Sequence, residues 1–368
     1  KMSEVKRLLC ILSNMNTGGA ETFLMKLYRN LDKNKYQMDF CVNSKKNFYD
    51  DEIKNMGGRI YTIPTKSESP IKSFCGIKNI VKENKYQYVM RINEHSLSVI
   101  DLLAAKAGGA KRLIMRSSNA SSGSKKSIIL HKLFKFLPMY IPDVKIAPSK
   151  LAAEYTFGKK AVNTGKVIIL YNGVDIDLFK FNDDIRNLYR KKFKLEDKLV
   201  IGHIGRFNEQ KNHKFLISVF KKIREKQNNA VLMLIGEGNL EQEIKKQVKE
   251  LSLSDSVLFL GVRKDISQLL LAMDGFLFPS FYEGMPNTVI EAQTTGLPCI
   301  VSDTITREAT VTNNVYFLPL NSNVNEWSEV VINCIKTNID RKATANVMIQ
   351  KGYDIKKCTE KFVAIVFD

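Results

Sequence analysis

The 368-residue sequence has no run of 18 apolar residues free of charge, so no segment is long and apolar enough to span a bilayer. Residues 1–7 lead directly into an apolar strand pattern and not into the core of a signal peptide. We therefore expect a cytoplasmic protein that is neither exported nor embedded in the membrane. The hydrophobic share of 44% and the charged share of 26% are those of an ordinary globular protein.

Residues that ligate metals are few and scattered. The six cysteines include no CxxC pair, and the four histidines, at positions 95, 131, 203 and 213, are too far apart for a zinc site. Isolated cysteines in mostly apolar surroundings indicate buried free thiols in a reducing compartment. No acidic cluster follows a strand pattern, so we expect neither a divalent cation nor a cofactor.

Acidic residues are also scarce. There are 38 Asp and Glu against 57 Lys and Arg, which gives a net charge of +19. This excess favours an anionic partner such as nucleic acid, an acidic lipid surface or a phosphorylated substrate, although a lysine-rich composition alone would also explain it. The chain has no RRM, KH or helix-turn-helix pattern, so we expect no specific nucleic-acid partner.

Short apolar runs alternate with segments of helical periodicity along the whole chain. The alternation predicts parallel sheets covered by helices on both faces. The chain is about twice as long as a typical domain, and the pattern restarts at residue 199, so we predict an α/β protein with two domains. Predicted strands include 38–42, 59–63, 86–92 and 112–116, and predicted helices include 71–84, 240–251 and 324–336.

Residues 275–303 have the pattern strand, loop, helix, strand. An apolar run ends at Pro279, a helix opens near Pro286, and Gly296 and Pro298 end that helix. The N–H groups in the first turn of a helix have no partners within the helix, so they form a site for a phosphate.

Two carboxylates flank this predicted phosphate site. Glu283 lies in the loop and Glu291 about one turn into the helix, so both can border one pocket. Because a phosphate repels carboxylates, hydroxyl groups are their sensible partners, and a sugar and a ribose supply them. The stretch therefore suggests that the ligand is a sugar joined to a nucleoside through a diphosphate. The alternative is two solvated glutamates near a helix start.

Small or basic residues follow the first strand of each half. Gly18 and Gly19 lie between a strand and a helix, where the backbone can approach a ligand closely, and a purely structural turn is the alternative. Arg206 and Lys211 follow the strand that starts at 199, where they can neutralise a diphosphate. A solvated loop is the alternative for this pair.

Polar residues also follow strands in the first half. Ligands of doubly wound sheets gather at the carboxyl ends of strands, so His95, Arg116 and Asn119 are candidates for the acceptor side of a cleft. A lone histidine at such a place is often structural, which is the alternative for His95.

Residues 125–141 (KKSIILHKLFKFLPMYI) mix lysines with bulky apolar side chains and contain no acidic residue. Such a segment suits an anionic membrane surface, where it would bring the site to a lipid-carried acceptor. A core-packed helix with a solvated lysine face is the alternative.

The string EGMPNTVIEAQTTGLPCIVSD resembles the E-x7-E signature of the family 4 glycosyltransferases. GGAE, NGVD, GRFNEQKN and GEG resemble further motifs of that family, so the likeness covers nearly the whole chain. It implies the GT-B fold, in which two Rossmann-like domains face each other across a cleft. The implied domains are 1–171 on the acceptor side and 172–352 for the nucleotide sugar, with 353–368 crossing back onto the first.

The resemblance also implies roles for individual residues. Glu283, Arg206 and Lys211 would act on the transferred sugar and the diphosphate. Residues of several loops would bind the donor: Gly18, Gly19, Glu237, Val262, Arg263, Gly284, Met285, Pro286, Asn287, Thr288 and Glu291.

The implied reaction moves a sugar from a nucleotide diphosphate, most often UDP, to a hydroxyl of a glycan or lipid-linked acceptor in cell-surface polysaccharide synthesis. The family retains the anomeric configuration and needs no metal. Relatives commonly carry histidines at strand ends of the first domain, but here Arg116, Ser117 and Ser118 stand at one such place. A non-catalytic subunit that binds nucleotide sugars is therefore an alternative. An epimerase of related fold is a further one.

Overall fold

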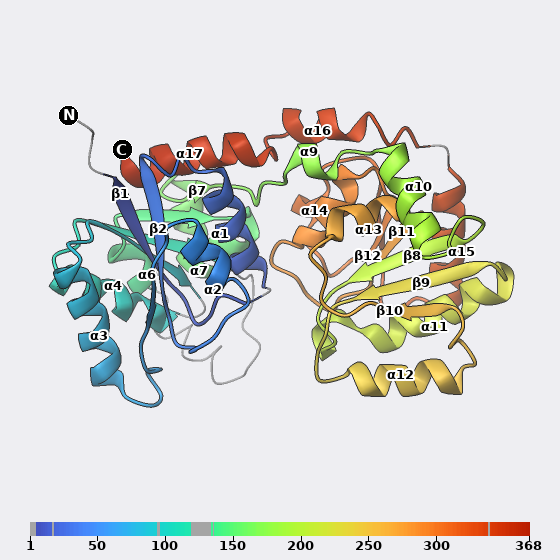
Figure 1. Cartoon of the computed structure of the whole chain (residues 1–368), viewed down its shortest axis with the longest axis horizontal. Helices are drawn as coiled ribbons and strands as arrows, with labels where there is room; N and C mark the ends of the chain where they lie inside the picture. Colours follow the sequence, from blue (N-terminus) through green and yellow to red (C-terminus); the bar gives the residue numbers. More distant parts are fainter. Residues whose placement is uncertain (1–4, 17, 94–95, 119–133, 135, 338) are drawn as a thin grey trace. The chain divides into compact units, whose positions relative to one another are not determined.

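The computed structural model describes all residues except 1–4, 17, 94–95, 119–133, 135 and 338 (Figure 1). The chain divides into two compact units, Lys1–Gly173 with Gly352–Asp368, and Val174–Lys351. We call these unit 1 and unit 2. The first segment of unit 1 ends at Gly173, two residues after the predicted boundary at 171. The chain returns to unit 1 at Gly352, one residue before the predicted start of the returning segment at 353. The last helix, α17 (Ile355–Phe367), belongs to unit 1.

Unit 1 is built on a seven-stranded parallel sheet with the order β3-β2-β1-β4-β5-β6-β7. The central strands are mostly apolar and mostly buried, as expected for a parallel sheet that helices cover on both faces. The strands are β1 (Lys6–Ile11), β2 (Tyr36–Val42), β3 (Ile60–Thr62), β4 (Tyr88–Asn93), β5 (Arg112–Ser117), β6 (Val144–Ala147) and β7 (Ile168–Ile169).

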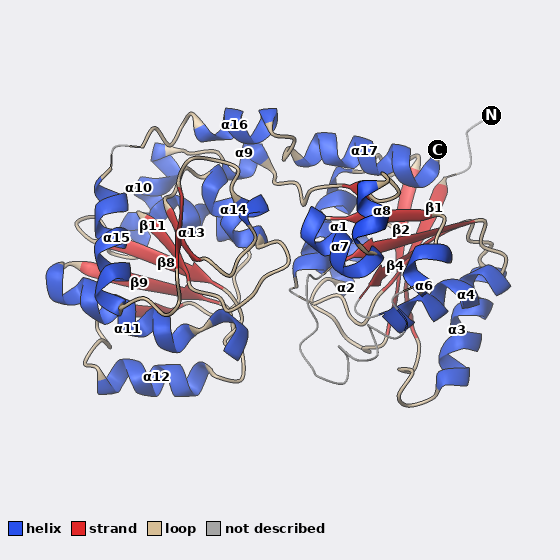
Figure 2. Cartoon of the chain, turned by 180° about the vertical axis from the view of Figure 1, so that it is seen from behind, coloured by secondary structure: helices blue, strands red, loops and turns tan. Residues whose placement is uncertain are grey.

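Helices cover both faces of this sheet, and two apolar cores result (Figure 2). One core lies under α1 (Gly19–Asn30), α2 (Asp50–Asn55) and α17. The other lies under α3 (Pro70–Glu83), α4 (Ile100–Ala107), α7 (Lys150–Phe157) and α8 (Lys159–Asn163). Capping is visible at α3, where Ser69 accepts a hydrogen bond from the Lys72 N–H and Pro70 takes the first helical position. Unit 1 also contains the short helices η1 (Ser96–Val99) and α6 (Leu137–Tyr140).

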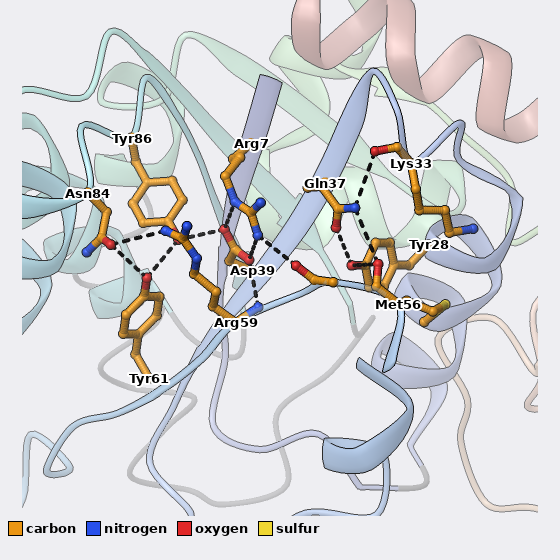
Figure 3. A network of polar contacts seen from close by, with 11 residues as sticks. Arg7, Tyr28, Lys33, Gln37, Asp39, Met56, Arg59, Tyr61, Asn84 and Tyr86 are labelled. Carbon is orange, nitrogen blue, oxygen red and sulfur yellow. Dashed lines mark hydrogen bonds and ion pairs between the residues drawn. The ribbon is translucent and has the colours of Figure 1, made fainter. Parts of the chain in front are cut away.

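A buried polar network ties the strands of unit 1 together near their amino ends (Figure 3). Asp39, which is fully buried in β2, accepts hydrogen bonds from the guanidinium of Arg7 at 2.6 Å and from the hydroxyl of Tyr86 at 2.6 Å. The backbone N–H of Arg59 donates a further bond to Asp39 at 2.7 Å. The carboxylate is therefore paired and hydrogen-bonded, as a buried charge must be.

Unit 2 repeats the same plan with a six-stranded parallel sheet, β10-β9-β8-β11-β12-β13. Helices α11 (His213–Lys226), α12 (Glu241–Glu250) and α15 (Val324–Lys336) cover its main core. The remaining helices form a second layer: α9 (Ile176–Phe179), α10 (Asp183–Lys192), α13 (Ile266–Ala272), α14 (Asn287–Thr294) and α16 (Thr344–Gln350). The strands are β8 (Leu199–Ile204), β9 (Ala230–Ile235), β10 (Val257–Phe259), β11 (Gly275–Phe278), β12 (Cys299–Ser302) and β13 (Val315–Leu318), with η2 (Glu209–Lys211) and η3 (Arg307–Ala309) in the loops.

The two strand orders confirm the predicted pair of Rossmann-like units. In each unit the order reverses between its first and fourth strands, which are β1 and β4 in unit 1 and β8 and β11 in unit 2. Ligands of such sheets bind beside the carboxyl ends of those two strands.

All six cysteines are free thiols, and five of them are buried while Cys75 is exposed. Burial raises the pKa of Cys10 and of Cys299 above the ordinary thiol value. None of the helices in the described part of the chain combines the length and the apolar character that a membrane span requires.

Candidate functional site

The candidate site lies where β8 and β11 of unit 2 end. The loop 205–212 follows β8 and the loop 279–286 follows β11, and amide groups join the two. The N–H of Phe281 donates to the carbonyl of Gln210 at 2.9 Å, and the Gln210 side chain donates to the carbonyl of Tyr282 at 2.9 Å. The Asn212 side chain donates to the carbonyl of Pro279 at 3.2 Å. Gln210 and Asn212 could not be singled out from the sequence, because isolated amide side chains carry no periodic signal.

An ion pair connects the same two loops. The ammonium of Lys211 lies 2.6 Å from a carboxylate oxygen of Glu283, and the two side chains are only 17% and 10% exposed. The ammonium also lies 4.7 Å from the ring centroid of Phe278. Two residues that are 72 positions apart, each predicted from its own motif, are thus in direct contact. A ligand that carries both phosphate and hydroxyl groups could replace each partner of the pair.

Helix α14 begins directly after this loop. Pro286 occupies its cap position, and its side chain makes no capping hydrogen bond to the first turn. Met285 is buried, while Gly284, Asn287 and Thr288 are partly exposed. The first turn therefore presents N–H groups and the positive end of the helix dipole at the carboxyl edge of the sheet.

Glu291 lies on α14 and is only 6% exposed. Its carboxylate is thus largely removed from water, unlike that of an ordinary helix glutamate. The alternative of two solvated glutamates at a helix start does not describe Glu291 or the paired Glu283.

The glycines of the GEG motif have a packing role that the sequence analysis did not identify. Gly236 has φ +136°, and a Cβ there would lie 2.2 Å from the carbonyl oxygen of Gly205. A Cβ on Gly238 would lie 2.4 Å from the carbonyl oxygen of Phe207. The two glycines let the loop after β9 pack directly against the loop that carries Arg206. Glu237, between them, has an exposed side chain, and its carbonyl accepts from the N–H of Phe207 at 3.0 Å.

The other predicted donor-binding residues of unit 2 lie on nearby loops. The side chain of Arg206 is exposed, and Val262 is 37% exposed after β10. The guanidinium of Arg263 forms two hydrogen bonds with Asp265, at 2.8 and 2.6 Å. The side chain of Arg263 therefore has a local partner.

The residues predicted for unit 1 have different environments. Gly18 is the cap residue of α1, and a carboxylate oxygen of Glu21 occupies the space 2.2 Å from where its Cβ would be. Arg116 is 1% exposed, lies 4.1 Å over the ring of Phe23 and donates to the side chain of Asn172. Burial lowers the pKa of Arg116 to about 9. His95 and Asn119 lie outside the described residues, so the acceptor side stays a prediction.

Metal-ligating side chains do not gather in the described part of the chain, where no group of three or more His, Cys, Asp or Glu is placed to hold an ion. The positive charges of the candidate site come from Arg206, Lys211 and the start of α14.

Comparison with known proteins assigns both halves of the chain to sugar-transferring families. Residues 184–354 match the family model described as glycosyl transferases group 1, and residues 17–178 match glycosyltransferase family 4. The chain is 32% identical to EpsF of Bacillus subtilis, which is named as a glycosyltransferase, over 96% of this chain and 94% of that protein.

Two further relatives have more specific names. The UDP-Gal:alpha-D-GlcNAc-diphosphoundecaprenol alpha-1,3-galactosyltransferase of Escherichia coli is 26% identical over 84% of each chain. The capsular polysaccharide biosynthesis glycosyltransferase CapH of Staphylococcus aureus is 26% identical over 98% of each chain. Among solved structures, Anabaena HepE in complex with UDP and glucose superposes with a TM-score of 0.78 at 17% identity, over 97% of this chain and 98% of that one.

Proposed function

The chain belongs to the glycosyltransferases of these families and shares their GT-B fold, and from that premise we propose that it transfers a hexose from a UDP-sugar to a hydroxyl of a lipid-linked glycan in polysaccharide synthesis. The observation that carries this proposal is the Lys211–Glu283 pair at the strand-order reversal of unit 2, next to the start of α14. The pair places a cation for phosphate beside a carboxylate for sugar hydroxyls.

In the proposed reaction the bond between the anomeric carbon and the diphosphate oxygen breaks, and the acceptor oxygen forms a new bond to that carbon on the same face. The acceptor proton passes to the departing phosphate oxygen. Negative charge grows on the diphosphate as the bond breaks, so Lys211, Arg206 and the N–H groups of α14 stabilise the transition state more than the bound donor. Glu283 orients the sugar ring, and Glu291 holds the ribose hydroxyls. Because protein cations supply the charge, the proposal needs no metal.

The remaining predicted residues complete the donor site. In this proposal the backbone at Val262 and Arg263 meets the nucleobase, and the residues of the 284–288 turn approach the diphosphate. The crystallised neighbour HepE contains UDP and glucose, and the Escherichia coli relative is named for UDP-galactose, so a UDP-sugar is the donor that these names support.

We further propose that the acceptor is lipid-linked and that the protein works at the cytoplasmic face of a membrane. The Escherichia coli relative is named for a diphosphoundecaprenol acceptor. The 125–141 segment lies mostly outside the described residues, but Phe136 and Tyr140 at its end are 57% and 79% exposed. Exposed aromatic side chains next to lysines suit a membrane interface.

A donor screen tests the proposal. UDP- and GDP-sugars are added to the purified protein, and the unfolding temperature is measured; a sugar nucleotide at 100 times its Kd should stabilise the fold by about 2.7 kcal/mol. The donor that binds is then incubated with lipid-linked sugar acceptors, and the products are analysed. Transfer of the hexose is the expected result. Binding without transfer or hydrolysis would indicate a non-catalytic subunit, and conversion of the donor alone would indicate an epimerase.

A further inference from the structure

Two imidazole rings are buried directly beneath the loop that carries Lys211. His203 lies on β8 and is 0% exposed, and His213 is the first residue of α11 and is 2% exposed. Their ring centroids are 4.8 Å apart with the planes at 81°. His213 also stacks on Phe207 at 4.2 Å, and His203 on Phe278 at 5.4 Å. The two imidazoles and the rings of Phe207 and Phe278 thus form one cluster of packed rings next to the Lys211 loop.

Hydrogen bonding fixes the tautomer of His203. Its Nδ1 lies 2.9 Å from the carbonyl oxygen of Leu277, and because a carbonyl only accepts, Nδ1 carries the proton. The Nε2 of a neutral ring is then a bare lone pair. Neither this nitrogen nor either nitrogen of His213 has a hydrogen-bond partner among the described residues. Buried nitrogens without a hydrogen-bond partner lower the stability of the folded state. The presence of three such nitrogens here therefore suggests that the two histidines have a role other than stabilising the fold.

Lys211 lies next to the bare nitrogen. A Cβ built on Gly205 would be 2.9 Å from Nε2 of His203 and 3.1 Å from both Cδ and Cε of Lys211. The missing side chain of Gly205 therefore leaves the lysine stem beside the histidine, on its way to Glu283. A larger residue at 205 would displace one of them.

The charges around the rings favour the neutral state. Burial first and then the charge of Lys211 lower the pKa of His213 from 6.5 to about 4. The pKa of His203 lies well below the ordinary value because of burial first, then His213 and Lys211. Among the charged groups here, Lys211 is itself paired with Glu283 at 2.6 Å. A proton on either ring would therefore place a second buried cation beside the ammonium.

We propose that His203 and His213 are positioning residues, a neutral pair that holds Lys211 in reach of the diphosphate and releases it when either ring is protonated. The part of this proposal that concerns the diphosphate rests on the proposed function. The contact between the histidines and Lys211 does not.

The first experiment needs no ligand. The imidazole nitrogens are titrated by NMR in the wild type, in Lys211→Met and in the control Lys214→Met, which removes an exposed lysine next to His213 that pairs with Glu243. Removing the Lys211 ammonium should raise the pKa of at least one ring measurably, and the control should not. Equal titrations in wild type and Lys211→Met would overturn the proposal.

The second experiment measures the affinity for UDP-glucose at about pH 7.5 and about pH 4, a range in which the diphosphate ester stays ionised. Because the pKa of His213 is about 4, about half of these rings are protonated at the lower pH, so we expect the wild type to lose about twofold in affinity in acid. His213→Phe, which keeps the stack on Phe207 without a titrating group, should lose measurably less. An unchanged acid loss in His213→Phe would overturn the proposal. If the wild type bound no sugar nucleotide at pH 7.5, the proposed function would fail, and the NMR titration would still decide the positioning role.

Discussion

The two units place an ion pair of the same length at opposite ends of sheets that have the same strand order. In unit 1 the Arg7–Asp39 pair lies near the amino ends of the strands, and in unit 2 the Lys211–Glu283 pair lies at the carboxyl ends; the N–O distance is 2.6 Å in both. Asp39 also receives bonds from Tyr86 and the Arg59 backbone, all within unit 1. Glu283 lies in the loop that leads into α14, whose cap residue, Pro286, makes no side-chain capping bond.

The difference shows how one interaction type serves two purposes. A buried carboxylate with several partners stabilises the fold, because removing it leaves each partner unpaired. An ion pair at the reversal of strand order lies where α/β sheets bind ligands, so its partners can exchange for ligand groups. We therefore expect changes at Asp39 to act on stability and changes at Lys211 to act on activity.

The largest expected effect is on unit 1. Asp39→Ala should destabilise unit 1 by about 3–5 kcal/mol, because it leaves a partly buried Arg7 and the Tyr86 hydroxyl without their acceptor. Urea unfolding followed by circular dichroism measures the loss. Trp327, the only tryptophan, lies in unit 2, so its fluorescence should report an unchanged transition for that unit. A loss below about 1 kcal/mol would contradict the structural role of the network.

The two units should also lose stability at opposite ends of the pH scale. His213 has a pKa lowered from 6.5 to about 4, so its contribution is complete above pH 6.5 and is lost as the pH falls toward 4. Burial and then Asp39 raise the pKa of Tyr28 from 10 to about 12, so its contribution is complete below pH 10 and is lost as the pH rises toward 12. Each pKa shift corresponds to a change of about 3 kcal/mol in the free energy of unfolding.

Unfolding temperatures measured across these two ranges test the contrast. Trp327 fluorescence should show unit 2 weakening first in acid, whereas circular dichroism should show unit 1 weakening first in alkali. His213→Phe should reduce the acid loss, and Tyr28→Phe should reduce the alkaline loss. Simultaneous unfolding of both units in acid with no response to His213→Phe would refute this assignment.

At the carboxyl edge of unit 2, Lys211→Ala should lower kcat/KM for sugar transfer by roughly 100-fold, about 2.7 kcal/mol, since the lost cation stabilises the leaving diphosphate. Glu291→Ala should cost at least about tenfold through the ribose contact. Both variants should remain folded, with a cooperative unfolding transition of the kind that the wild type shows. Lys214→Ala, an exposed neighbour, is the control and should retain wild-type turnover. Wild-type turnover in Lys211→Ala would remove that residue from the site.

The sequence was sufficient to predict many of the helices and strands. The predicted helix 324–336 is α15, and the predicted strand 112–116 is β5 without its last residue. Hydrophobic periodicity predicts these helices and strands because each of them has a buried face. Glu283 and Lys211 could be predicted because each belongs to a motif at the end of an apolar strand.

What the sequence could not predict depends on contacts between distant segments. The Asp39 network joins residues from four places in unit 1, and none of them stands out by spacing. Arg116 looks like an exposed strand-end residue, yet it lies in the core over Phe23, because a guanidinium can stack on a ring. The contact between His203 and His213 likewise depends on how β8 and α11 pack.

The smallest expected effect comes from a third ion pair of the same length. Arg29 and Glu52 on the surface of unit 1 also have an N–O distance of 2.6 Å, but their side chains are 43% and 39% exposed. Because water screens both charges, Arg29→Ala should change the free energy of unfolding by less than about 1 kcal/mol. The same urea experiment that measures Asp39→Ala measures this variant. A loss as large as that of Asp39→Ala would mean that ion-pair distance, and not burial, determines the contribution of these residues to the fold.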